Sequence, residues 1–343
     1  PPLRPRRLEV FGVGPDWVQL TWSALGPGPV EVRCGDQHVD VDADGGPGAV
    51  VLDGLAEGAE HRLELRGEGL PEPVTTSART LARPPGEELL RVATVSDAHV
   101  GSIATGYLHT IAENPQPAVP HTVRCLRAAL DELGAWGAEH LVVKGDLVHL
   151  SLEEHWVAAA RELSHVDIPV EVLPGNHERS KEGGIDPRQA AAEVGLAFVE
   201  RVRHVDHAGV RIVMADTCQL DTDLGAVTAV ADDLRAAVAT DSPVLVALHH
   251  QPMRFLLVPS GHTHRHRRHV IDGVTATEVG STKDFPGTWA GYHVHEGGIT
   301  QVVRRIAEPS CIRWTDHTRR AAAGAWGRWS PGRLDDRCFT LTW

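Results

Sequence analysis

The first 83 residues show short runs in which apolar and polar positions alternate, which is the pattern of half-buried β-strands. The clearest runs cover residues 18–22, 30–33 and 61–66, and clusters of Gly, Pro and Asp separate them. Runs of period two at this spacing predict an antiparallel β-sandwich. We expect residues 1–83 to form this small domain. Since the sequence shows no catalytic cluster in it, we expect it to pack against the rest of the chain or position it.

After residue 88 the pattern changes to buried strands that alternate with amphipathic helices. Strands are predicted at 91–95, 140–143, 170–173, 210–214 and 244–248, helices at 122–133 and 232–239, and hairpins at 270–279 and 292–302. The spacing of Ser151 and Glu154 predicts a capping box that opens a further helix. Alternating strands and helices indicate a layered α/β domain. We expect it at residues 88–300, after a stiff linker at 84–87 and before a Trp- and Arg-rich extension, 301–343, packed on it.

The composition excludes several classes of protein. The chain has 343 residues, 33 of them basic and 46 acidic, and the net charge of −13 disfavours binding to duplex nucleic acid. No run of about 18 apolar residues occurs, so no membrane-spanning helix is expected. The five cysteines are scattered, which fits reduced thiols better than disulfides or a zinc ribbon. With no leader-like segment at its start, we expect a cytoplasmic protein, although a cleaved signal peptide would leave no trace.

Polar residues that bind metals well follow four of the predicted strands and one further strand that leads into residue 260. The segments are SDAH at 96–99, KGDLVH at 144–149, LPGNHE at 173–178, LHHQP at 248–252 and SGHTH at 260–264. The carboxyl ends of strands in an open α/β sheet are where ligands sit, so we expect these side chains to converge. Within two of the segments, Asp97 with His99 and His262 with His264 are two residues apart and can point the same way.

The residue types in these segments fit a metal centre. Carboxylate, imidazole and amide ligands suit borderline divalent ions and differ from a thiolate site. Seven candidate ligands are too many for one tetrahedral ion, but they suffice for two ions if one carboxylate bridges them. Two ions about 3.5–4 Å apart stabilise both the attacking and the leaving oxygen of a displacement at phosphorus.

The motifs DxH, GD, GNHE, HHxP and GHTH, in this order over about residues 90–285, resemble the calcineurin-like metallophosphoesterase superfamily. The resemblance implies a layered α/β/β/α sandwich that holds two divalent ions (Mn, Fe or Zn). It implies a first ion held by Asp97, His99, Asp146 and His264, and a second held by Asp146, Asn176, His249 and His262. It favours His249 over His250 because of the spacing after residue 246. It also implies that His177 is a catalytic residue that contacts the phosphate and protonates the leaving group.

The N-terminal runs resemble a fibronectin type III-like domain, with LTW at 20–22, LDGL at 52–55 and a closing TT at 75–76. Purple acid phosphatases also carry a β-sandwich before the catalytic domain, but they place a Tyr ligand where this chain has His149. We therefore expect no iron–tyrosinate colour and no direct membership of that group.

A DxH motif followed by GNHE more closely resembles bacterial phosphodiesterases of the cyclic-nucleotide or glycerophosphodiester type. The expected activity is thus hydrolysis of a small nucleotide or glycerophosphodiester-like substrate. A phosphomonoesterase is the first alternative. A metal-binding scaffold without catalysis is the second, and it would be expected to lack ligands or His177, neither of which is lost.

Three further residues are candidate substrate contacts: His250, Tyr107 on the loop after the first ligand pair, and Arg265 in the cation-rich run 264–269. Only eleven residues separate His250 from His262, which is short for a crossover between parallel strands. We expect either a deletion at this point or residues missing from the numbering. The aromatic tail is expected either to cover the site as a flap or to pack against the domain edge.

Overall fold

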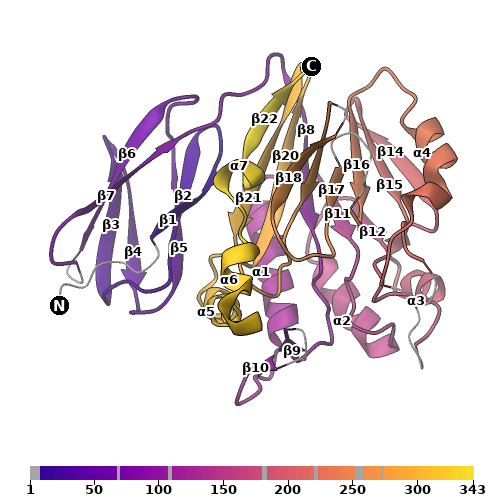
Figure 1. Ribbon diagram of the computed structural model, residues 1–343, viewed down its shortest axis with the longest axis horizontal. Helices are drawn as coiled ribbons and strands as arrows, with labels where there is room; N and C mark the ends of the chain where they lie inside the picture. The colour runs from indigo at the N-terminus through magenta and orange to yellow at the C-terminus, as the bar shows by residue number, and fades with distance from the viewer. Residues whose placement is uncertain are drawn as a thin grey trace.

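The computed structural model describes residues 8–67, 70–106, 110–179, 184–219, 223–251, 258–271 and 273–343. Figure 1 shows a β-sandwich on the left of the view beside a larger α/β body. Within the described residues, no helix has both the length and the apolar character that a membrane span requires.

The N-terminal unit is a sandwich of two antiparallel sheets, which confirms the predicted small all-β fold. One sheet has the spatial order β1 (Glu9–Val13), β2 (Trp17–Trp22), β5 (Gly48–Asp53). The other has the order β4 (Gln37–Ala43), β3 (Gly28–Cys34), β6 (Glu60–Gly67), β7 (Val74–Arg79). The pattern analysis missed β4, in which Val39, Val41 and Ala43 alternate with Asp40 and Asp42, because Asp is rare in strands. The charges fit its place at the edge of its sheet, where they discourage pairing with another chain.

The sandwich is fixed to the α/β body by side chains of its first two strands. Trp17 is buried in the same hydrophobic cluster as the helices of the body. The Gln19 side chain donates to the carbonyl of Arg305 and accepts from its N–H, both at 2.8 Å. The Arg337 guanidinium donates to the carbonyl of Phe11 at 2.8 Å. These buried contacts hold the two parts together independently of the linker.

The body contains a seven-stranded mixed sheet. Its order is β13 (Ala197–Phe198), β12 (Val170–Leu173), β11 (His140–Lys144), β8 (Glu88–Val95), β20 (Thr288–His295), β21 (Gly298–Arg305), β22 (Phe339–Thr342). The first four strands are parallel and the last three join antiparallel. The proposed boundary at residue 300 therefore falls inside β21, and residues 339–342 form the edge of the main sheet.

A second layer of strands faces this sheet. It comprises β14 (Val202–His207), β15 (Val210–Ala215) and β16 (Val244–Leu248), together with β17 (Val258–Ser260), β19 (Val274–Glu278) and β18 (Arg267–Ile271). The two groups meet where the N–H of Gly261 donates to the carbonyl of His249 at 2.9 Å.

Helices cover both outer faces. They are α1 (His121–Trp136), α2 (Glu153–Leu163), α3 (Pro187–Glu193), α4 (Ala231–Ala237) and α5 (Pro309–Thr318). Apolar side chains fill the space between α1–α3 and the large sheet, between the two sheets, and between the second sheet and α4. This order of layers confirms the expected α/β/β/α arrangement.

Most of the predicted elements of the body form where the sequence places them, including the two helices and both hairpins. The capping box at Ser151 and Glu154 is wrong. Helix α2 begins at Glu153 after Leu152, and no side chain caps it. The Ser151 hydroxyl instead accepts from the Trp156 indole at 3.0 Å, so a tertiary contact has replaced the local one. The short connection between His250 and His262 lies largely outside the described residues, because 252–257 are not described.

His121, at the start of α1, makes stability depend on pH. Its ring is 1 % exposed and stacks on Trp314 at a centroid distance of 4.0 Å. Burial, followed by the charge of Lys283, lowers its pKa to about 3. In the unfolded chain the pKa is about 6.5, so below that pH the unfolded state takes up the proton and the free energy of unfolding falls. We expect His121→Phe to reduce this fall by up to about 1.4 kcal/mol per pH unit, measured by urea unfolding between pH 7.5 and 5.

His38, on the exposed edge strand β4, provides the matched control for this measurement. His38→Phe should leave the pH dependence of unfolding as in the parent chain. An unchanged pH dependence in His121→Phe would contradict the assignment of His121 as a buried neutral group.

Candidate metal centre

The loops that follow β8, β11, β12, β16 and β17 bring the five sequence motifs together at one end of the body. The backbone at these loops is strained. Five of the eight described non-glycine residues with left-handed φ are candidate ligands, namely Asp97, His99, Asp146, His262 and His264, with φ between 47° and 67°. Such conformations persist where the surrounding structure enforces them, and they cluster at functional sites.

The first group of ligand atoms surrounds one point. The Nε2 atoms of His99 and His264 lie 3.4 Å apart. His264 Nε2 is 3.3 Å from Asp97 Oδ1, and His99 Nε2 is 3.5 Å from Asp146 Oδ2. Two imidazole nitrogens that face each other beside two carboxylates form a donor set that fits a divalent cation.

The second group adjoins the first and shares a carboxylate with it. Asn176 Oδ1 lies 3.2 Å from His249 Nε2 and 3.0 Å from His262 Nδ1. Asp146 Oδ2 is 3.5 Å from His249 Nε2, the same distance that separates it from His99 Nε2. This one oxygen is therefore placed to contact ions in both groups.

The charges of the centre call for a cation. Burial disfavours the charged form of Asp97, but His264 outweighs it and lowers the pKa of Asp97 to about 2. Burial also opposes protonation of His249 and His264. Asp146 nevertheless raises the pKa of His249 to about 9, and Asp284 with Asp97 raises that of His264 to about 10. The buried carboxylates thus favour positive charge on these rings, and divalent ions that displace the imidazole protons would supply the same compensation.

Neighbouring groups orient the imidazoles. His249 donates through Nδ1 to the carbonyl of Lys144 at 2.8 Å, and His264 donates through Nδ1 to Asp284 Oδ2 at 2.8 Å. Each bond leaves Nε2 directed to the centre, as is usual for metal-binding histidines. The sequence analysis did not identify Asp284, because it follows neither a predicted strand nor a recognised motif. Thr105 holds the same Asp284 oxygen at 3.1 Å.

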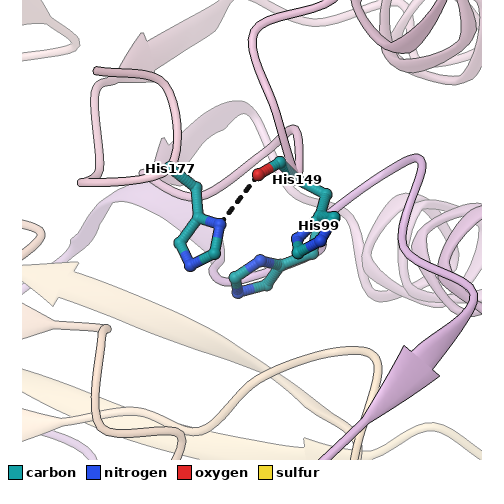
Figure 2. A group of neighbouring side chains, drawn as sticks. All are labelled: His99, His149 and His177. Atoms are coloured by element: carbon teal, nitrogen blue, oxygen red, sulfur yellow. Dashed lines mark hydrogen bonds between the residues drawn. The ribbon is translucent and has the colours of Figure 1, made fainter. Parts of the chain in front are cut away.

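His177 lies at the edge of the centre, half-buried. Its backbone N–H donates to Asp146 Oδ1 at 2.9 Å, and its Nδ1 donates to the carbonyl of His149 at 2.8 Å, as Figure 2 shows. Its ring centroid is 4.4 Å from that of His99. With Nδ1 held as the donor, Nε2 is the nitrogen available to exchange a proton.

The four layers and the convergence of five ordered motifs on a shared carboxylate decide the fold. The chain has a calcineurin-like metallophosphoesterase fold. No family model and no curated protein matches its sequence.

Several solved structures are similar to it, all at low identity. A purple acid phosphatase from yellow lupin seeds shares 14% identity over 87% of this chain and 72% of its own, with a TM-score of 0.45. PhoD shares 11% over 88% and 87%, with a TM-score of 0.41. Vps29 from Entamoeba histolytica, complexed with zinc, shares 14% over 64% and 94%, with a TM-score of 0.36.

Glu178, the last residue of the GNHE motif, lies behind the candidate metal centre and connects its loops. It is fully buried and accepts hydrogen bonds from the N–H groups of Asp146 and Val148, both at 2.8 Å, and of Gly175 at 2.6 Å. Burial and the neighbouring Asp146 raise its pKa to about 7, which the backbone donors oppose. The sequence analysis gave this residue no role, although it ties the loops after β11 and β12 to each other.

The structure also places two of the three candidate substrate contacts and one histidine that the sequence analysis left unassigned. His250 is buried, and its Nδ1 lies 2.9 Å from the Thr217 hydroxyl. It lies beside His249 and His262 of the second ligand group. Tyr107 lies outside the described residues. His149 forms a third cluster with His99 and His177 (Figure 2), a neighbour that the sequence analysis did not count as a ligand.

Arg265, the third candidate substrate contact, is paired with a carboxylate. Its Nε and Nη2 donate to Glu278 at 2.6 and 2.9 Å. Its charge is therefore compensated within the protein.

Proposed function

We propose that the protein is a metal-dependent phosphoester hydrolase with two adjacent divalent-ion sites. The observation that carries this proposal is the position of Asp146, whose Oδ2 is equidistant from an imidazole of each ligand group. Two ions that share a carboxylate lie at the separation that phosphoryl displacement requires.

The ligand sets that we propose are those that the family resemblance implies, and the short distances within each set support them. Asp97, His99, Asp146 and His264 would hold the first ion, and Asp146, Asn176, His249 and His262 the second. Bound divalent ions lower the pKa of water and neutralise charge on phosphate oxygens. The residues of the chain would hold these ions at fixed places, because Glu178 accepts a hydrogen bond from the loop of Asp146 and Asp284 orients the His264 ring.

His177 would serve as the proton donor to the leaving oxygen. Its Nδ1–H is engaged by the His149 carbonyl, so a proton on Nε2 faces the substrate side and can be transferred there. The hydrogen bond from its backbone to Asp146 fixes this ring relative to the shared carboxylate.

The substrate class that we propose is a small phosphodiester of the nucleotide or glycerophosphodiester type, with Mn, Fe or Zn as the metal. The motif pattern supports it, since DxH followed by GNHE is similar to bacterial phosphodiesterases of that kind. The net charge of −13 further favours a small substrate over long nucleic acids.

Metal analysis and two chromogenic esters test the proposal. We expect manganese-loaded protein to bind about two ions per chain and to hydrolyse bis(p-nitrophenyl) phosphate with a higher kcat/KM than p-nitrophenyl phosphate, because the site is proposed for diesters. Removal of metal with EDTA should abolish both activities, and added Mn²⁺ should restore them. Inactivity of the fully metallated protein on both esters would favour a non-catalytic metal-binding role. A preference for the monoester would overturn the assignment of substrate class.

A further inference from the structure

Two tryptophans of the C-terminal segment lie beside the metal centre. They belong to the short helix α6 (Trp326–Trp329). The ring centroid of Trp326 is 6.1 Å from that of His264 and 5.2 Å from that of Trp329. Trp329 is 45 % exposed and Trp326 is half-buried, so the pair presents indole surface to solvent next to a candidate metal ligand.

Backbone hydrogen bonds fix this pair relative to the centre. The N–H of His266, two residues after His264, donates to the carbonyl of Ser330 at 2.8 Å. Ser330 is fully buried, and its hydroxyl donates to the carbonyl of Trp326 at 2.9 Å. The preceding turn contains Ala322 and Ala323 at φ 49° and 54°, a strained conformation for residues other than glycine. These bonds place the backbone of α6 beside the ligand loop.

Arg265 supports the aromatic pair. Its guanidinium lies over the Trp329 ring at 4.9 Å, and its bidentate bond to Glu278 holds it there. Arg265, which the sequence analysis named as a candidate substrate contact, is thus already engaged within the protein. The exposed part of this surface is therefore the planar indole of Trp329, and Arg265 does not provide a free group for binding an anion.

We propose that Trp326 and Trp329 form a subsite that stacks the nucleobase of a phosphoester whose phosphate lies at the metal centre. The proposal rests on the proposed hydrolase function and narrows its substrate class to nucleotides. Every nucleobase has a π-face that stacks on an indole, whereas a glycerol unit has none. A quaternary ammonium group also binds indoles. However, Arg265 already lies over one face of Trp329, and the exposed Arg328 precedes Trp329 in the chain. These two positive charges disfavour a cationic ligand.

Kinetics with two esters that share a leaving group test the subsite. The substrates are thymidine 5′-(p-nitrophenyl phosphate) and methyl p-nitrophenyl phosphate. We expect Trp326→Ala and Trp329→Ala each to raise KM for the nucleoside ester about tenfold and to leave the methyl ester unaffected, because only the former loses a stacked base. Trp329 is exposed, so its variant keeps the test valid if Trp326→Ala folds poorly.

Trp343→Ala is the matched control. Its indole is 62 % exposed. Trp343 follows β22 at the edge of the sheet that contains Glu88, the first residue of β8. The ligand loop follows the other end of β8, so Trp343 lies away from it. It should leave the kinetics with both esters unchanged. Equal losses on the two esters in the Trp326 and Trp329 variants, or no loss on either, would overturn the subsite.

A binding measurement separates failure of the subsite from failure of the hydrolase proposal. Calorimetry on the manganese-loaded protein would compare adenosine 5′-monophosphate, ribose 5-phosphate and phosphocholine. We expect the nucleotide to bind about tenfold more tightly than ribose 5-phosphate, and the difference to vanish in Trp329→Ala. This result without hydrolysis of any ester would refute the hydrolase function and retain the subsite. Equal affinity for nucleotide and ribose 5-phosphate, or tighter binding of phosphocholine, would refute the subsite.

Discussion

Replacement of Asp146 by Ala is expected to lower kcat/KM for the aryl diester by at least about a thousandfold. Its Oδ2 lies 3.5 Å from both His99 Nε2 and His249 Nε2, so both proposed ion sites lose a ligand at once. Two bound ions stabilise the transition state of phosphoryl displacement by several kcal/mol, which corresponds to a rate factor of about a thousand. Steady-state kinetics and metal analysis by plasma mass spectrometry on the same samples would measure both losses.

Two further variants provide the comparison for Asp146→Ala. Asp97→Ala removes a ligand of the first ion only, so it should reduce the metal content by about one ion per chain while the second site stays loaded. Asp167, which is exposed, provides the matched control, and Asp167→Ala should keep both metal content and rate. Turnover by Asp146→Ala close to that of the parent chain would refute the shared-carboxylate arrangement.

Local patterns allowed much of the fold to be predicted, because they report directly on burial. In α1, the apolar residues Leu126, Leu130 and Leu133 recur at helical spacing, and all are buried against the sheet. Long-range pairing has no such local signal. Val92 in β8 pairs with Tyr292 in β20, two hundred positions later, and the composition of neither strand specifies the other.

The same contrast between local and long-range signals applies to the candidate site. Each predicted ligand lies in a loop that follows a strand, so the carboxyl ends of the strands bring the ligands together once the sheets form. Asp284 acts on His264 from a loop with no pattern of its own. His149 acts on His177 through a backbone carbonyl, a role that any residue type can fill and that sequence therefore does not encode. The sequence analysis therefore missed the residues that hydrogen-bond to the ligands and orient them, because no local pattern marks them.

We expect His177→Gln to lower kcat by about 10²–10³-fold for a diester with an alkyl leaving group, with little change in metal content. The imidazole belongs to neither ligand set, and its Nε2 is the nitrogen placed to deliver a proton to the leaving oxygen. A p-nitrophenolate group departs without that proton, so the loss with bis(p-nitrophenyl) phosphate should be much smaller. Comparison of kcat for the two esters measures the difference.

The leaving-group dependence distinguishes proton transfer from a structural effect of losing the ring. His149→Ala keeps the carbonyl that binds Nδ1 of His177, so it should preserve the difference between the two esters if that carbonyl orients the acid. His165→Gln, at an exposed position in the turn after α2, should change neither rate. A loss in His177→Gln that is the same for alkyl and nitrophenyl esters would show that His177 stabilises the phosphate but donates no proton.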